Sequence, residues 1–191
     1  DGALIVEDGR ILEVGKREQL LSKNPGAEIE EFPHCALLPG LVNAHTHLDL
    51  LYFNDATPDF FDWLLKSWEY RQGLNIATRR QALEQGLRQL VSSGTTTVGD
   101  AGQYAGLLSQ AATSPIRMAL FPELLTGGEP TIPESYQTVL GQVEEISSLR
   151  SDKITAGLGP YAPYTLSRHL LKILAQQARE TKIALQIHVA E

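Results

Sequence analysis

Two histidines that lie one residue apart, His45 and His47, are the side chains in this sequence best placed to do chemistry. They end an apolar stretch, residues 36–44, that is predicted to form a β-strand. Residues i and i+2 of a strand point to the same face, so both imidazoles project from one strand end. Two neutral imidazoles placed in this way can share a divalent metal ion. An H-x-H triplet often occurs by chance, but its position after Pro39, Gly40 and an apolar strand favours metal binding.

The segments around this pair alternate between strands and helices. Short apolar or β-branched runs predict five strands, at residues 36–44, 95–98, 116–121, 154–158 and 183–189. Helical segments separate them, and the first is predicted to have an apolar face made of Phe60, Phe61, Leu64, Leu65 and Trp68. This alternation is typical of a parallel sheet with helices on its outside.

The fold class follows from the chain length and from the motifs. An open doubly wound sheet is one possibility, but no glycine-rich phosphate motif follows any of the strands. A (β/α)8 barrel needs about 250 residues, so this chain has room for about five of the eight units. We therefore predict an α/β fold, a partial (β/α)8 TIM-type barrel over residues 34–191. Residues 1–33 form a separate N-terminal portion, in which Asp8-Gly9 predicts a β-hairpin.

Further polar side chains fall at the carboxyl ends of the predicted strands, where ligands bind in such folds. His188 lies near the end of the last strand, and only the H-x-H pair distinguishes it from a partly buried polar residue. Tyr161 and Tyr164 are candidates for substrate binding, or for packing of a proline-rich loop. Asp100 could bind substrate or cap the loop that follows it. Asp49 is a candidate for the pocket mouth.

The composition excludes several classes of protein. The chain is 42% apolar and 20% charged, so it can bury a core, and its net charge of −7 argues against a nucleic-acid or membrane-surface binder. No apolar run approaches the roughly 20 residues that span a bilayer. The single cysteine, Cys35, rules out an internal disulfide and fits a reducing compartment. We expect a cytoplasmic protein that forms a homo-oligomer and takes a small-molecule substrate.

Four motifs carry a resemblance to a known family. They are PGLVNAHTH at 39–47, GTTTV at 94–98, GPYAPYTLS at 159–167 and IHVAE at 187–191. In this order they resemble the amidohydrolase superfamily, in its deaminase and chlorohydrolase branch. The stretches after the first and second motifs look most like those of aminodeoxyfutalosine deaminase and S-adenosylhomocysteine deaminase-like proteins. The N-terminal hairpin resembles the small β-sandwich that members of this family build from both chain ends.

The resemblance implies roles for particular residues. His45, His47 and His188 would ligate one divalent metal, with Zn2+ favoured and Fe2+ as the alternative. Glu191 would shuttle protons to the substrate beside the metal. The family's further histidine and aspartate would come from later strands, beyond the end of this sequence. Two-metal relatives carry a bridging lysine at the end of the strand that corresponds to residues 154–158, and none stands there.

The implied reaction is hydrolytic removal of an amino group, as ammonia, from a purine- or nucleoside-like substrate. Tyr161 stands where relatives often have a histidine that faces the substrate, so the alternatives include a chlorohydrolase or a cyclic amide hydrolase on the same scaffold. A catalytically inactive fragment is a further alternative. An open barrel exposes edge strands, so we expect this chain to self-associate or to be a portion of a longer polypeptide.

Overall fold

The computed structural model describes residues 1–126 and 134–189 of the chain. Its internal contacts divide the chain into two compact units, Asp1–Leu38 and Pro39–Glu191, each considered by itself below. The boundary between residues 33 and 34 that the sequence suggested stays a prediction. None of the helices in the described ranges is both long and apolar enough to cross a bilayer.

The N-terminal unit is a β-hairpin followed by a short helix. Strands β1 (Gly2–Glu7) and β2 (Arg10–Lys16) pair antiparallel. Both turn residues, Asp8 and Gly9, have positive φ, as the tight primed hairpin turns require. The predicted hairpin is therefore confirmed. The helix α1 (Arg17–Lys23) follows at once, and it was not predicted, because Leu20 is the only residue that it buries.

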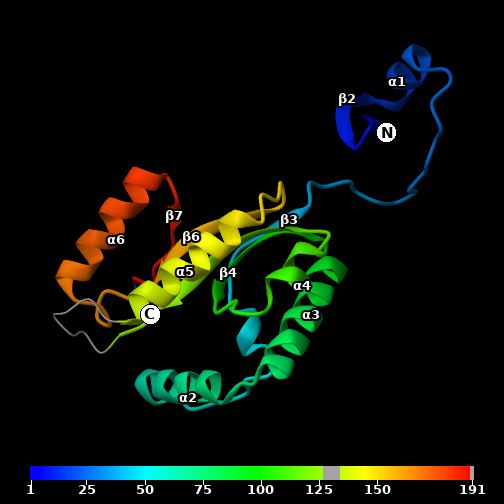
Figure 1. Cartoon of the computed structure of the whole chain (residues 1–191). Coiled ribbons are helices and arrows are strands. Elements are labelled where there is room, and N and C mark those ends of the chain that lie inside the picture. The colour runs from blue at the N-terminus through cyan, green and yellow to red at the C-terminus, as the bar shows by residue number, and fades with distance from the viewer. Residues whose placement is uncertain (127–133, 190–191) are drawn as a thin grey trace. The chain divides into compact units, whose positions relative to one another are not determined.

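The larger unit is built on five parallel strands in the order β3-β4-β5-β6-β7 (Figure 1). The strands are β3 (Leu41–Thr46), β4 (Thr95–Gly102), β5 (Arg117–Leu124), β6 (Ile154–Pro160) and β7 (Ala184–Leu185). Each strand pairs with the next one along the chain, which is the connectivity of a (β/α) barrel. The predicted partial barrel is confirmed.

Helices connect these strands and cover the sheet. They are η1 (Leu48–Leu50), α2 (Phe60–Gly73), α3 (Ile76–Ser92), α4 (Leu108–Ala112), α5 (Glu134–Ser148) and α6 (Arg168–Thr181). One buried cluster joins Val98 and Leu120 of the sheet to Leu83 of α3. A second joins Leu158 to Leu170 and other residues of α5 and α6. The apolar outer face of the sheet thereby forms the core.

The observed strands differ in extent from the predicted ones: β4, β5 and β6 run two to four residues further, and β3 and β7 differ most. β3 begins at Leu41 and not at residue 36, since Pro39 has no N–H to donate to a strand partner. β7 is confined to Ala184–Leu185. The chain nevertheless continues alongside β6, because the N–H of His188 donates to the carbonyl oxygen of Tyr161 at 2.9 Å. This bond sets the position of the third histidine.

The first barrel helix lies in an unexpected orientation. α2 buries Ser67 and Arg71, whereas Phe61 and Leu65 are exposed. The face predicted from apolar spacing is therefore wrong in part. The buried face instead contains Leu64, Ser67 and Arg71. Leu64 and Arg71 are seven residues apart, which is about two helical turns, so they lie on the same side of the helix. A cation is thus directed at the carboxyl ends of the strands.

Candidate metal centre

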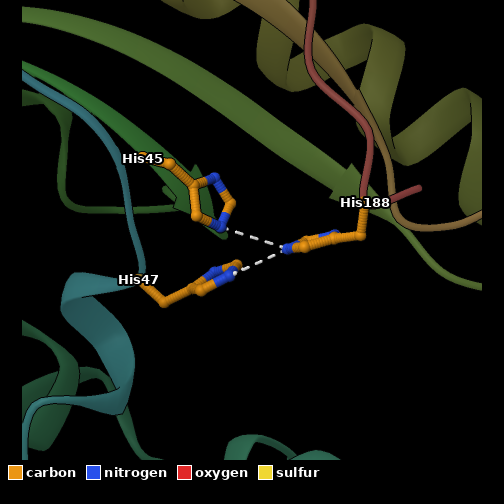
Figure 2. A group of neighbouring side chains, drawn as sticks. All are labelled: His45, His47 and His188. Carbon is orange, nitrogen blue, oxygen red and sulfur yellow. Dashed lines mark hydrogen bonds between the residues drawn. The ribbon is translucent and has the colours of Figure 1, made fainter. Parts of the chain in front are cut away.

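Three imidazoles converge at the carboxyl end of the sheet (Figure 2). The Nε2 atom of His188 lies 3.2 Å from Nε2 of His45 and 3.3 Å from Nε2 of His47. One ligand nitrogen from each of the three residues falls within 4.8 Å of the others. A tetrahedral zinc ion with Zn–N bonds of 2.0–2.1 Å separates its nitrogens by about 3.3–3.4 Å. The donor set and two of its spacings therefore fit a divalent metal.

Strand geometry and one long-range pairing explain this convergence. His45 and His47 extend from the end of β3 at the i and i+2 positions, as predicted. His188 lies 141 residues further along the chain than His47, and the path of the chain beside β6 brings it to the same point. The sequence thus predicted all three members of the cluster, although their role as metal ligands stays a prediction.

Backbone carbonyl groups orient two of the rings. The Nδ1 atom of His188 lies 2.8 Å from the carbonyl oxygen of Tyr161, and Nδ1 of His47 lies 2.8 Å from that of Ala101. A proton on Nδ1 that is donated to a carbonyl leaves Nε2 with its lone pair directed at the cluster. Bonds of this kind commonly fix the ring orientation of histidines that bind metals.

A buried ionic cluster lies behind His47. The guanidinium of Arg71 donates through Nη1 to Glu123 at 2.7 Å and through Nη2 to Asp49 at 3.2 Å. Its Nη2 also lies 2.9 Å from Nδ1 of His47. Arg79 approaches Asp49 at 3.9 Å, so two cations and two carboxylates are buried together without net charge.

Two contacts in this cluster are incomplete. Nε of Arg71 lies 3.2 Å from Oδ2 of Asp49, close enough for an ion pair, but these atoms are not aligned for a hydrogen bond. We regard the contact as electrostatic only. Oε1 of Glu123 has no hydrogen-bond partner among the described residues. The cluster therefore fixes the orientation of His47, while the burial of its charges lowers the stability of the folded protein.

Burial shifts the protonation of these groups. It raises the pKa of Glu123 to about 6, against the opposing effect of Arg71. It also raises the pKa of Asp49, again opposed by Arg71. Burial, reinforced by the charge of Arg71, lowers the pKa of His47 to about 3. His47 is therefore neutral near pH 7, as a metal ligand must be.

Asp100 binds the backbone at Leu48, just after β3, and the side chain of Tyr104, just after β4. It is 2% exposed, and its Oδ1 accepts a hydrogen bond from the N–H of Leu48 at 2.8 Å. The hydroxyl of Tyr104 lies 2.5 Å from the Asp100 carbonyl oxygen and 2.9 Å from its Oδ2. Burial raises the pKa of Asp100 to about 8. The substrate contact suggested from the sequence stays a prediction, while the visible contacts are structural.

The remaining predicted site residues lie around the histidines. The ring of Tyr161 is buried, and its centre lies 4.7 Å from that of the His188 ring. Tyr164 is 52% exposed. Asp49 belongs to the ionic cluster described above. Glu191, the predicted proton shuttle, lies outside the described residues. The roles of all four stay predictions.

A cavity of about 140 Å³ adjoins the cluster, with Trp68, Arg71, Glu123 and Tyr161 in its wall. A larger cavity of about 430 Å³ opens between α5 and α6, but no histidine lines it. The smaller one is the relevant space, because Tyr161 and Arg71 join it to the histidine rings. Sequence reasoning missed Arg71, although its spacing from Leu64 on α2 offered a signal.

Comparison with known proteins identifies the family. A profile described as "Amidohydrolase family" matches residues 36–191, and one described as "Imidazolonepropionase-like composite domain, bacteria" matches residues 2–27. The chain belongs to the amidohydrolase family. The 5'-deoxyadenosine deaminase of Methanopyrus kandleri is 32% identical over 100% of this chain and 45% of its own length.

Solved structures share the fold of this chain. Aminofutalosine deaminase of Helicobacter pylori in complex with methylthio-coformycin matches with a TM-score of 0.84 and 25% identity, over 99% of this chain and 46% of that one. A variant of atrazine chlorohydrolase from Arthrobacter aurescens, complexed with zinc and atraton, matches with a TM-score of 0.81 and 21% identity, over 100% and 49%. The chain spans under half the length of each of these proteins.

Proposed function

We propose that this chain is part of a metal-dependent hydrolase that removes an amino group, as ammonia, from a purine- or nucleoside-like substrate. The observation that carries the proposal is the convergence of three imidazole Nε2 atoms at the carboxyl ends of two barrel strands. The names of the relatives, which are deaminases of adenosine-like nucleosides, support the choice of substrate class.

His45, His47 and His188 are the proposed ligands of one divalent metal, Zn2+ in preference to Fe2+. Zinc is favoured because three imidazoles suit its tetrahedral coordination and leave one position open. A divalent metal held by these three residues would supply Lewis-acid activation of water near neutral pH.

The chain's own groups would position the substrate and move protons. Tyr161 forms the wall between His188 and the cavity, so we propose that it contacts the substrate, with Tyr164 at the exposed rim. Glu191 follows His188 by three residues, and we propose it as the acid that protonates a ring nitrogen and the leaving amine. Asp49 and Asp100 would act indirectly, through Arg71 and the Leu48 backbone.

The proposed setting is the cytoplasm, in a homo-oligomer that acts on a small molecule and not on nucleic acid or membranes. The net charge of −7 supports the absence of a nucleic-acid or anionic-membrane surface. The lone cysteine, Cys35, supports a reducing compartment. Sedimentation of the purified protein tests the oligomer, and a monodisperse monomer would contradict it.

The first experiment measures bound metal and ammonia release with the full-length protein of which this chain is a part. We expect about one zinc or iron per chain by elemental analysis, and ammonia from adenosine-like nucleosides. His188→Ala should lose both. His169→Ala is the matched control, since His169 is exposed on α6 and should retain both.

The same experiment separates the alternatives. Chloride release from chlorotriazines, or opening of cyclic amides, without ammonia release would replace the deaminase by another hydrolase on this scaffold. Metal binding without turnover of any substrate would favour an inactive protein. A protein that holds no metal would overturn the proposed site itself.

A further inference from the structure

The two polar atoms within hydrogen-bond distance of Nδ1 of His47 make incompatible demands, while Oε2 of Glu123 lies further away, at 3.7 Å. The carbonyl oxygen of Ala101 lies 2.8 Å away and can only accept a hydrogen bond. The Nη2 atom of Arg71 lies 2.9 Å away and can only donate one. In a neutral imidazole, Nδ1 either carries the proton or offers a lone pair. His47 can therefore satisfy one of these neighbours at a time.

The choice decides whether His47 can bind a metal. With the proton on Nδ1, the ring donates to Ala101 and Nε2 is free to ligate. With the proton on Nε2, the ring accepts from Arg71 and its N–H points at His188, 3.3 Å away. His188 can then accept that bond and donate its own Nδ1–H to the carbonyl of Tyr161 at 2.8 Å. A continuous chain of hydrogen bonds thus exists for the form that cannot bind metal.

Arg71 is held firmly in this contact. Its side chain is 10% exposed, and the carboxylates of Glu123 and Asp49 pair with its guanidinium. One hydrogen of Nη2 is donated to Asp49, which leaves the second for His47. A hydrogen bond from a cation is roughly twice as strong as one between neutral groups. In the absence of metal, the contact with Arg71 should therefore prevail over the contact with Ala101.

We infer that Arg71 is a positioning residue that lowers the metal affinity of the site by competing for Nδ1 of His47. This inference rests on the metal-dependent function proposed above. When metal binds, the ring proton moves from Nε2 to Nδ1 and is donated to Ala101, so the proton count of the ring does not change. One buried N–H of Arg71 then loses its acceptor. A buried donor without a partner weakens binding by about tenfold, and the effect makes the metal easier to exchange.

The first test follows the ring nitrogens of the wild-type protein by 15N NMR. The signals of His47 are assigned by their absence from His47→Asn. We expect an unprotonated Nδ1 in protein stripped with a chelator, and a protonated Nδ1 after zinc is added. A proton on Nδ1 in both states would overturn the inference, and this test needs no altered Arg71.

The second test compares zinc affinity by competition with a chromogenic chelator. In Arg71→Lys the charge is kept for Glu123 and Asp49, but the lysine nitrogen ends one bond short of the position of Nη2. We expect zinc to bind about tenfold more tightly. Arg79→Lys is the matched control, because Arg79 approaches Asp49 and does not contact His47 among the described contacts. It should leave the affinity unchanged.

The outcomes separate this inference from the function on which it rests. If wild-type zinc binding depends on His47 but Arg71→Lys binds zinc as the wild type does, the competition is refuted and the metal site stands. If Arg79→Lys tightens binding equally, the effect comes from the ionic cluster as a whole, which also refutes a specific role for Arg71. If the wild-type protein binds no zinc, both proposals fail.

Discussion

Asp100→Asn should remove a pH dependence of stability that the buried carboxyl group imposes. Burial raises the pKa of Asp100 from 3.8 to about 8 in the folded protein. The hydrogen bonds that Asp100 accepts from the N–H of Leu48 and from the hydroxyl of Tyr104 oppose this shift, but burial outweighs them. The side chain of Asn has nearly the same shape as that of Asp and does not titrate, so it is neutral at any pH.

The sign and size of the effect follow from linkage. Between pH 4 and 8 the folded protein holds a proton at Asp100 that the unfolded chain has lost, so this group's stabilisation falls as pH rises. It is fully present below about pH 4 and is lost as pH passes through about 8. The slope is about 1.4 kcal/mol per pH unit. His47, whose pKa is lowered from 6.5 to about 3, has the opposite slope below pH 6.5, so the clearest window lies above it.

The assay is urea unfolding at several pH values from 6.5 to 8, with metal removed by a chelator. We expect the wild type to lose about 1.6 kcal/mol more than Asp100→Asn across this window, because the slope halves as pH reaches the pKa. Asp152→Asn, at an exposed aspartate, should behave like the wild type. If the free energy of unfolding changed with pH in the same way for the wild type and Asp100→Asn, the folded protein would hold no proton on this carboxyl. That result would refute the reasoning.

Three further predictions concern stability and are measured by the same unfolding assay. Gly157→Ala should destabilise the protein by about 1–3 kcal/mol, since its Cβ would lie 2.3 Å from the ring of Phe121, whereas Gly141→Ala, with open space around it in α5, should stabilise by about 0.5–1 kcal/mol. Equal effects of the two substitutions would refute the close packing. Leu120→Ala should lower the free energy of unfolding by about 3–5 kcal/mol, because this side chain is fully buried between the sheet and the helices. A loss below 1 kcal/mol would contradict that. Ser167→Ala should cost about 1 kcal/mol, since the hydroxyl caps α6, and Ser167→Asp should retain the cap.

Local patterns in the sequence determined much of this fold. Asp8-Gly9 specified the hairpin turn, since few residue pairs tolerate the backbone that it requires. The alternation of strands and helices predicted the parallel sheet. The i and i+2 spacing placed His45 and His47 on one strand face, because this periodicity is a property of the backbone itself.

Only the tertiary structure decided the environment of the metal centre. Apolar spacing predicted that α2 would bury Phe61 and Leu65, but the helix buries Arg71 instead. A buried arginine is stable only if carboxylates meet it, and Asp49 and Glu123 come from segments far apart along the chain. No local pattern carries that information, because the energy of each charge depends on the presence of the others. The two partners of His47 Nδ1 were for the same reason visible only after the chain had folded.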